Sequence, residues 1–243
     1  MKKITYDIEW ALERSHWWFV GRRKLFKFLF PLLGLRNELR VIDIGCGVGS
    51  NLRLLQSMSS KLVGVDSEMY GLLQVKKSLL PVALVNGDLM RLPFKADSVD
   101  LVLASDVLEH LDEDTIGIRE IYRSLKREGK VLFTVPAFRS LRGMQDIVGM
   151  HKRRYSKKEL VTKIEGEGFK IVRSSYFNFF PFFPILIGRR IIYLLGLKIE
   201  SENEINLPLI NFFLKAVFSI EPHYLKYLSF PFGVSIYCIA KKA

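Results

Sequence analysis

A glycine-rich turn after a short apolar run is the feature that most limits how this chain can fold. The segment VIDIGCGVGSN, residues 41–51, carries glycines at every second position, Gly45, Gly47 and Gly49. Glycine has no Cβ, so its backbone adopts dihedral angles closed to other residues and approaches a bound molecule closely. The segment therefore predicts a strand, a ligand-contacting turn, and a helix whose free N-H groups face the same ligand.

The rest of the chain alternates short apolar runs with helical stretches, which is typical of βαβ units and a parallel sheet. Strands are expected near residues 39–44, 61–66, 82–85, 99–104, 129–135, 169–176 and 233–241. Ser156 and Glu159 form a capping box that predicts the start of another helix. In such a sheet, ligands bind at the carboxyl ends of the first and fourth strands.

Acidic residues follow several of these strands at matching intervals. Asp66 ends the second strand, roughly 20 residues after Asp43, where an acid in dinucleotide-binding folds accepts the ribose hydroxyls. Asp88 follows the third strand, and Ser105 ends the fourth, after which a helix is expected to begin near Asp106. One such acid alone is as compatible with a solvated turn, but the set at these intervals indicates a nucleoside pocket.

These motifs together resemble the class I S-adenosylmethionine-dependent methyltransferases. The resemblance implies an α/β, Rossmann-like, seven-stranded sheet, mostly parallel with an antiparallel last strand inserted between the fifth and sixth, and helices on both faces. It implies S-adenosyl-L-methionine as cofactor, with Asp43 next to the methionine end and Asp88 at the adenine. The cofactor-binding residues predicted in the core are Asp43, Gly45, Cys46, Gly47, Gly49, Asp66, Ser67, Asp88, Leu89 and Ser105.

An aromatic and basic stretch precedes the first strand, with His-Trp-Trp-Phe at 16–19 and Gly-Arg-Arg at 21–23. The residues alone predict an amphipathic helix that covers one sheet face. The stretch is similar to the N-terminal element of a methyltransferase group related to types 11 and 12. In ubiquinone-pathway O-methyltransferases a helix before the sheet closes over the cofactor. The resemblance implies that residues 1–38 are a helical cap in which either Arg22 or Arg23 holds the cofactor carboxylate.

The long connection after the fifth strand predicts a substrate lid, because long connections in compact domains tend to be functional. His151 is the expected general base, since an imidazole titrates near neutral pH. The resembling group carries a basic His-x-Arg-Arg-Tyr element at the pocket mouth, which implies substrate contacts by Arg153, Arg154 and Tyr155. A solvated basic loop is the alternative. His110 is a second candidate base, or a structural hydrogen-bonding residue.

The predicted methyltransferase core comprises residues 39–176 and 233–243. Residues 177–232, the most apolar stretch of the chain, are inserted between these two parts. Prolines and charges break the apolar runs, so neither half predicts a transmembrane span. Phe, Leu and Ile combined with Lys and Arg predict a segment that lies in the plane of an anionic membrane surface. A substrate lid and a homo-oligomer contact are the alternatives.

The formal net charge of +12 suits a phospholipid surface and also RNA, but no separate RNA-binding module is present. The two cysteines indicate neither a disulfide nor a metal ligand set, and no metal is expected. The N-terminus lacks a signal-peptide pattern, which favours the cytoplasm. The leading hypothesis is O-methylation of a hydrophobic or lipid-linked acceptor, peripheral on the inner face of the cell membrane. The alternatives are methylation of a soluble sugar or small metabolite, RNA methylation, and cofactor binding without catalysis.

Overall fold

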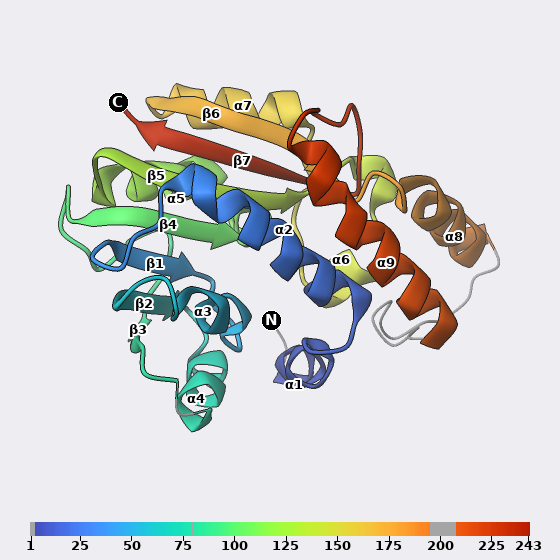
Figure 1. The fold of residues 1–243 in the computed structure, drawn as a ribbon, viewed down its shortest axis with the longest axis horizontal. Coiled ribbons are helices and arrows are strands. Elements are labelled where there is room, and N and C mark those ends of the chain that lie inside the picture. The colour runs from blue at the N-terminus through green and yellow to red at the C-terminus, as the bar shows by residue number, and fades with distance from the viewer. Residues whose placement is uncertain (1–2, 79, 195–207) are drawn as a thin grey trace.

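A computed structural model of the chain describes residues 3–78, 80–194 and 208–243 (Figure 1). It contains a 7-stranded sheet in the order β3-β2-β1-β4-β5-β7-β6. The strands are β1 (Arg40–Ile44), β2 (Lys61–Asp66), β3 (Ala83–Asn86), β4 (Val99–Ser105), β5 (Leu125–Pro136), β6 (Phe169–Phe177) and β7 (Ser235–Lys242). Strand β7 pairs antiparallel with both β5 and β6, and the other pairings are parallel. The predicted fold class is confirmed.

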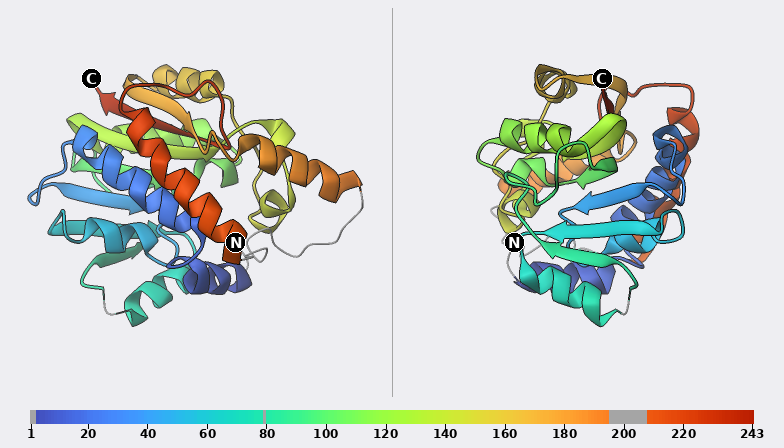
Figure 2. Two further views of the ribbon diagram at one scale, coloured as in Figure 1. Left: turned by 45° about the vertical axis from the view of Figure 1, so that its right-hand side comes forward. Right: turned by 90° about the vertical axis from the view of Figure 1, so that its left-hand side faces the viewer.

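Helices cover both faces of this sheet, with α2 and α9 on one side and α5 and α7 on the other (Figure 2). The helices are α1 (Lys3–Leu12), α2 (Trp17–Leu33), α3 (Ser50–Leu55), α4 (Met69–Lys77), α5 (Asp114–Ser124), α6 (Met144–Val148), α7 (Lys157–Gly166), α8 (Phe182–Leu194) and α9 (Pro208–Leu225). The central strands β1 and β4 and the C-terminal half of β5 are mostly apolar and buried, as expected when a parallel strand is covered on both faces. Ser156 caps α7 by accepting from the backbone N-H of Glu159 at 3.1 Å.

The segment after β4 is the main local difference from the sequence prediction, which places a helix start near Asp106. Asp106 has φ 54°, a left-handed conformation that interrupts a helix. The chain forms a short 3₁₀ turn instead, η1 (Leu108–His110), and α5 begins only at Asp114. His110 therefore lies on a tight turn at the strand ends.

The aromatic stretch before β1 forms the first turns of α2, and these turns pack against α9 as well as the sheet. A Cβ on Gly21 would lie 2.0 Å from the ring of Phe218, so only glycine permits this approach. The backbone N-H of Trp17 donates to Asn211 Oδ1 at 2.6 Å. The ring of Trp18 stacks 6.1 Å from that of Phe177. Helices α2 and α9, which are far apart in the sequence, thus form one layer on this face of the sheet.

The predicted insertion, 177–232, contains α8 and α9, and its residues 195–207 lie outside the described part of the chain. Glu221 of α9 holds this segment to the end of β6. Its carboxylate accepts from the backbone N-H of Asn178 at 2.6 Å and of Phe180 at 3.2 Å. Among the described helices, none combines the length and apolar character that crossing a bilayer requires.

Candidate functional site

The glycine turn leaves β1 in a conformation that other residues rarely adopt. Gly45, Gly47 and Gly49 have φ of 67°, 51° and 84°. A Cβ on Gly45 would lie 2.1 Å from Val107 Cγ1, so the turn also has no room for a side chain there. The N-H of Gly45 donates to the carbonyl of Val65 at 2.8 Å, which fixes the turn to the end of β2. Sequence and packing therefore agree that this turn needs glycine.

A cavity of about 360 Å³ opens beside this turn, at the carboxyl ends of the strands. Six of the predicted site residues line it, namely Gly45, Asp66, Ser67, Asp88, Leu89 and His110. Nine further lining residues were not predicted from the sequence, and they include Tyr6, Glu68, Asp106, Met150 and Lys152. Asp106 could have been predicted as a site residue, because it directly follows β4 at the switch point of the sheet, where ligands bind in such folds. Nothing in the sequence around Tyr6 places it here.

Asp66 links the cavity to the glycine turn. Its Oδ2 accepts from the N-H of Gly47 at 2.8 Å, and its Oδ1 accepts from that of Glu68 at 2.9 Å. Burial raises the pKa of the Asp66 carboxyl. The carboxylate is thus already oriented at the cavity wall, in a position suited to accept hydroxyl groups from a ligand.

Asp43 lies fully buried in β1 behind the turn, and burial raises its pKa to about 7. Asn51 Nδ2 donates to its Oδ1 at 3.3 Å. Its Oδ2 has no hydrogen-bond partner among the residues that the structure describes. A buried acceptor without a partner is costly, so a ligand that brings its own donor fits this position.

The remaining predicted cofactor residues surround the cavity without lining it. Cys46 is buried, with its thiol 3.1 Å from where a Cβ on Gly64 would lie, so only its backbone faces the turn. Ser105 Oγ lies 2.9 Å from Thr134 Oγ1 in the core. Contacts to a ligand by Cys46 and Ser105 stay predictions.

Helix α1 lies over the glycine turn. A Cβ on Gly47 would be 3.7 Å from Glu9 Oε2 and 3.8 Å from Tyr6 Cε1. Tyr6 is buried although it lies near the start of the chain. The N-terminal region therefore closes one side of the cavity, which is the geometry that a cap requires.

Arg22 and Arg23, which the sequence left as alternatives, point in different directions. Arg22 is buried, and its Nη1 donates to Asp106 Oδ2 at 2.8 Å, at the cavity wall. Arg23 donates to the backbone carbonyl of Glu13, beyond the end of α1. The structure thus brings Arg22 toward the site, and Arg23 supports the cap.

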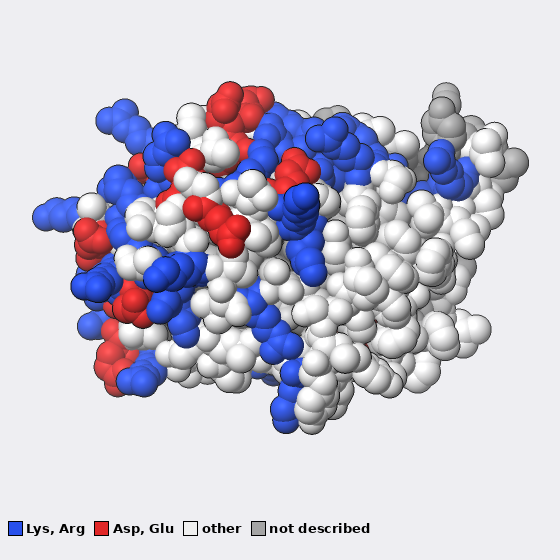
Figure 3. Space-filling view, turned by 90° about the horizontal axis from the view of Figure 1, so that it is seen from above, with Lys and Arg blue, Asp and Glu red and all other residues white. Residues whose placement is uncertain are grey.

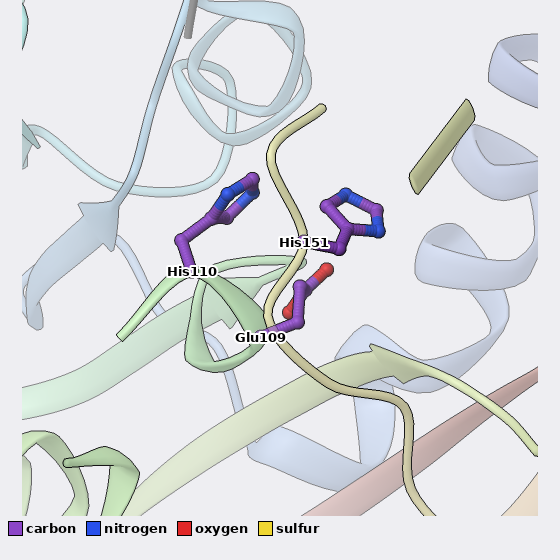
Figure 4. A group of neighbouring side chains, drawn as sticks. All are labelled: Glu109, His110 and His151. Carbon is purple, nitrogen blue, oxygen red and sulfur yellow. The ribbon is translucent and has the colours of Figure 1, made fainter. Parts of the chain in front are cut away.

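A second cavity, of about 350 Å³, lies in the basic connection after β5. Its lining residues are Arg139, Arg142, Asp146, His151, Lys152, Arg153 and Arg154. Lys152 lines both cavities, so the two adjoin. The rings of His110 and His151 meet edge to face at this junction, with centroids 4.9 Å apart (Figure 4).

Asp146 organises the second cavity from inside. Its carboxylate accepts from Arg154 Nε at 2.7 Å and from the N-H of Gly143 at 2.7 Å, and it contacts His151 Nδ1 at 3.0 Å. These donors hold the pKa of Asp146 well below its usual range, against the opposing effect of burial. Asp146 was not predicted, because its partners come from different turns of the connection.

The predicted substrate contact of Tyr155 does not fit its position. Its side chain is fully buried, and its hydroxyl donates to Asp114 Oδ2 at 2.8 Å. Arg154 is also buried, between Asp146 and the carbonyl of Ala137. Arg153 donates to the carbonyl of Leu111 at 3.0 Å while still lining the second cavity. Tyr155 therefore stabilises the connection from within, and the two arginines remain at the cavity wall.

Known proteins are similar to this chain in sequence and in fold. Residues 42–133 match a family model described as a methyltransferase domain. A probable S-adenosylmethionine-dependent methyltransferase of Mycobacterium tuberculosis is 26% identical over 65% of this chain and 57% of its own length. Demethylmenaquinone methyltransferase of Staphylococcus aureus is 30% identical over 50% of this chain and 54% of its own length. The chain thus spans less than two thirds of these relatives.

A solved structure supports the fold over nearly the whole chain. A SAM-dependent methyltransferase from Archaeoglobus fulgidus superimposes with a TM-score of 0.60 and 21% identity, covering 94% of this chain and 96% of the other. The sheet order and the glycine turn at the switch point define a Rossmann-like nucleoside-binding protein. The matched domain and these relatives support a class I S-adenosylmethionine-dependent methyltransferase. The unpaired oxygen of Asp43 and the glycine turn fit S-adenosyl-L-methionine, the cofactor of this class.

Proposed function

We propose that this methyltransferase transfers the methyl group to an oxygen atom of a hydrophobic or lipid-linked acceptor at the cytoplasmic face of a membrane. The observation that carries the acceptor class is the apolar surface of α8 and α9. Large exposed apolar patches on soluble proteins mark interaction sites. A lipid surface is the partner that matches both the composition of these helices and the positive charge of the chain.

The apolar surface is formed by side chains that would ordinarily be buried. Phe183 of α8 is 55% exposed, and Leu209, Phe212 and Phe213 of α9 are 82%, 71% and 66% exposed. Figure 3 shows this end of the molecule as largely uncharged, whereas Lys, Arg, Asp and Glu gather over the other end. The exposed Lys226 lies just beyond α9, where a cation can meet anionic headgroups.

The second cavity favours an acceptor that carries an anionic group. Arg139, Arg142 and Arg153 line it, and guanidinium groups bind phosphate and carboxylate bidentately. Because Lys152 joins this cavity to the cofactor cavity, a headgroup bound there would be held close to the transferred methyl. A polyprenol-linked saccharide with a phosphate fits this arrangement. The name of the Staphylococcus relative, a demethylmenaquinone methyltransferase, supports a hydrophobic acceptor in general.

The cofactor's sulfonium makes its methyl group electrophilic, so the protein has mainly to position the reactants and exclude water. Asp66 would accept the ribose hydroxyls, and Asp88 and Leu89 would flank the adenine. His151, at the junction of the two cavities, is the proposed general base for the acceptor's proton. His110 is the weaker candidate, because burial lowers its pKa to about 4 and a base that weak takes a proton poorly at neutral pH.

The test is methyl transfer from S-adenosylmethionine with a labelled methyl group, using a bacterial lipid extract as acceptor. Label that enters the organic phase supports the proposal. Labelled product other than the cofactor itself in the aqueous phase, in a parallel assay with a soluble extract, means a soluble acceptor with α8 and α9 as a lid, and label in added RNA means an RNA acceptor. If no label is transferred although calorimetry detects cofactor binding, the chain binds the cofactor without catalysis. Gly45→Ala, which disrupts the turn, is the background control.

A further inference from the structure

Three side chains with metal-ligating atoms meet where the two cavities adjoin. Glu109 and His110 come from η1, and His151 comes from the chain segment that passes beside it (Figure 4). One carboxylate oxygen and one nitrogen from each ring lie within 4.8 Å of one another. Two imidazoles and one carboxylate form a ligand set that divalent transition metals commonly use.

The Glu109 carboxylate is the strongest sign that something binds here. The side chain is fully buried, and neither oxygen has a hydrogen-bond partner within the described ranges of the chain. An unpaired buried carboxylate is costly, and a cation bound by it would remove that cost.

Asp146 holds His151 in the orientation that a metal ligand needs. Its Oδ1 lies 3.0 Å from His151 Nδ1, and since a carboxylate oxygen accepts hydrogen bonds, this contact suits the tautomer with the proton on Nδ1. The lone pair is then on Nε2. A carboxylate behind a metal-binding histidine is the usual way to fix its tautomer and raise its basicity.

Gly149 leaves space for that second nitrogen. A Cβ at residue 149 would lie 2.8 Å from His151 Nε2, so any larger residue would move the ring. The backbone of Gly149 is ordinary helical, with φ −72° and ψ −9°, and does not itself need glycine. A side chain at residue 149 is therefore opposed by the His151 ring, and by the Gln145 carbonyl oxygen at 3.0 Å, rather than by backbone strain.

We propose that Glu109, His110 and His151 bind a divalent transition-metal ion such as Zn²⁺ at the junction of the cavities. Zinc bonds to nitrogen and carboxylate oxygen are about 2.0 to 2.2 Å long, so the three side chains must close around the ion by small rotations. Three protein ligands leave at least one position open. Because His110 lines the cofactor cavity, an acceptor oxygen could take that position and lose its proton more easily.

The first experiment is calorimetric titration of chelator-treated full-length protein with ZnCl₂. We expect one Zn²⁺ per chain with a Kd in the micromolar range or below. Glu109→Gln and His110→Ala should each weaken binding by about 100-fold or more, with near-ultraviolet circular dichroism to verify folding. His223→Ala, which removes an exposed histidine on α9, is the matched control and should bind as the wild type does.

A second variant tests the geometry without removing a ligand. Gly149→Ala should displace the His151 ring and weaken Zn²⁺ binding at least tenfold. Co²⁺ titration gives an independent readout, because its visible spectrum reports nitrogen ligation, and that spectrum should disappear in His110→Ala. The proposal is overturned if the wild-type protein binds no Zn²⁺ at micromolar concentrations, or if Glu109→Gln and His110→Ala bind it as tightly as wild type does. Binding requires no methyl acceptor, so this result is independent of the proposed function.

Discussion

The glycine turn and the α8–α9 segment use their unusual residues in opposite ways. At the turn, glycines remove side chains so that a concave site can form, and the polar groups around it point inward. On α8 and α9, large apolar side chains such as Phe212 and Phe213 point outward and have no cover from the described chain. The concave site at the turn suits a small ligand that it encloses. The exposed face of α8 and α9 suits an extended partner that lies against the outside of the protein.

Helix α2 connects these two regions through neighbouring residues. Arg22 faces the cofactor side, where it binds Asp106, and Gly21 faces the other side, where it receives the ring of Phe218. A helix places consecutive residues about 100° apart, so one short motif can serve both regions. The Gly-Arg-Arg motif is thus explained partly by the cofactor site and partly by packing against α9.

The largest effect on the cofactor side is expected from Gly45→Ala. The new Cβ would collide with Val107 and would require a left-handed alanine, so S-adenosylmethionine affinity should fall at least 100-fold. Gly166→Ala, at a position with open space, is the matched control and should bind normally. Isothermal titration calorimetry measures both. An alanine variant within tenfold of wild type would mean that the turn does not shape the site.

The next effect concerns the acid at the end of β2. Asp66→Ala should weaken S-adenosylmethionine binding at least tenfold, since charge-assisted hydrogen bonds contribute about 1.5 to 3 kcal/mol each. Asp88→Ala, at a more exposed position of the same cavity, should cost less. Equal affinities of Asp66→Ala and wild type, in folded protein, would remove Asp66 from the site.

The proposed membrane contact of α8 and α9 is tested by binding to anionic liposomes. Phe183→Ser, Ile187→Ser, Phe212→Ser and Phe213→Ser together should reduce co-sedimentation about tenfold and leave cofactor affinity unchanged. Phe182 is kept, because its ring packs 5.0 Å from that of Phe232. The control variant carries Leu73→Ser and Val172→Ser, which replace exposed apolar residues outside α8 and α9. Wild-type protein that stays in the supernatant at low salt would exclude the membrane surface, and a dimer in analytical ultracentrifugation would then explain the exposed face.

The smallest effect is a pH dependence at the attachment of α9. Burial raises the pKa of Glu221 to about 7 from a usual 4.5. The stability linked to its protonation is therefore complete below pH about 4.5 and is lost as the pH rises through about 7. Between these pH values the Tm of wild type should fall by a few degrees more than that of Glu221→Gln.

Comparing wild type with Glu221→Gln isolates the contribution of Glu221, because Asp43, whose pKa is also raised, titrates in the same way in both proteins. Thermal unfolding followed by circular dichroism gives the two curves. Parallel curves across the range would show that Glu221 is not buried as an acid. The segment around Asn178 would then need another explanation for its attachment to α9.

Much of the fold was predictable because its signals are local. The strands fall within a few residues of their predicted positions, with β5 extending further toward its N-terminus, since apolar runs bounded by turn residues depend only on neighbours in sequence. The break at Asp106 was missed, because its left-handed conformation depends on contacts with Arg22 and Thr134 from other elements.

The sequence by itself determined the glycine turn, the acid at the end of β2 and the apolar character of residues 177–232, because backbone freedom, spacing and hydropathy are properties of short segments. Only the tertiary structure decided that Arg22 rather than Arg23 pairs with Asp106 at the cavity wall and that Tyr155 is buried. It alone brought His151 to Glu109 and His110. These outcomes depend on distances between segments far apart in the chain, and those distances are set by packing of the whole sheet and its helices.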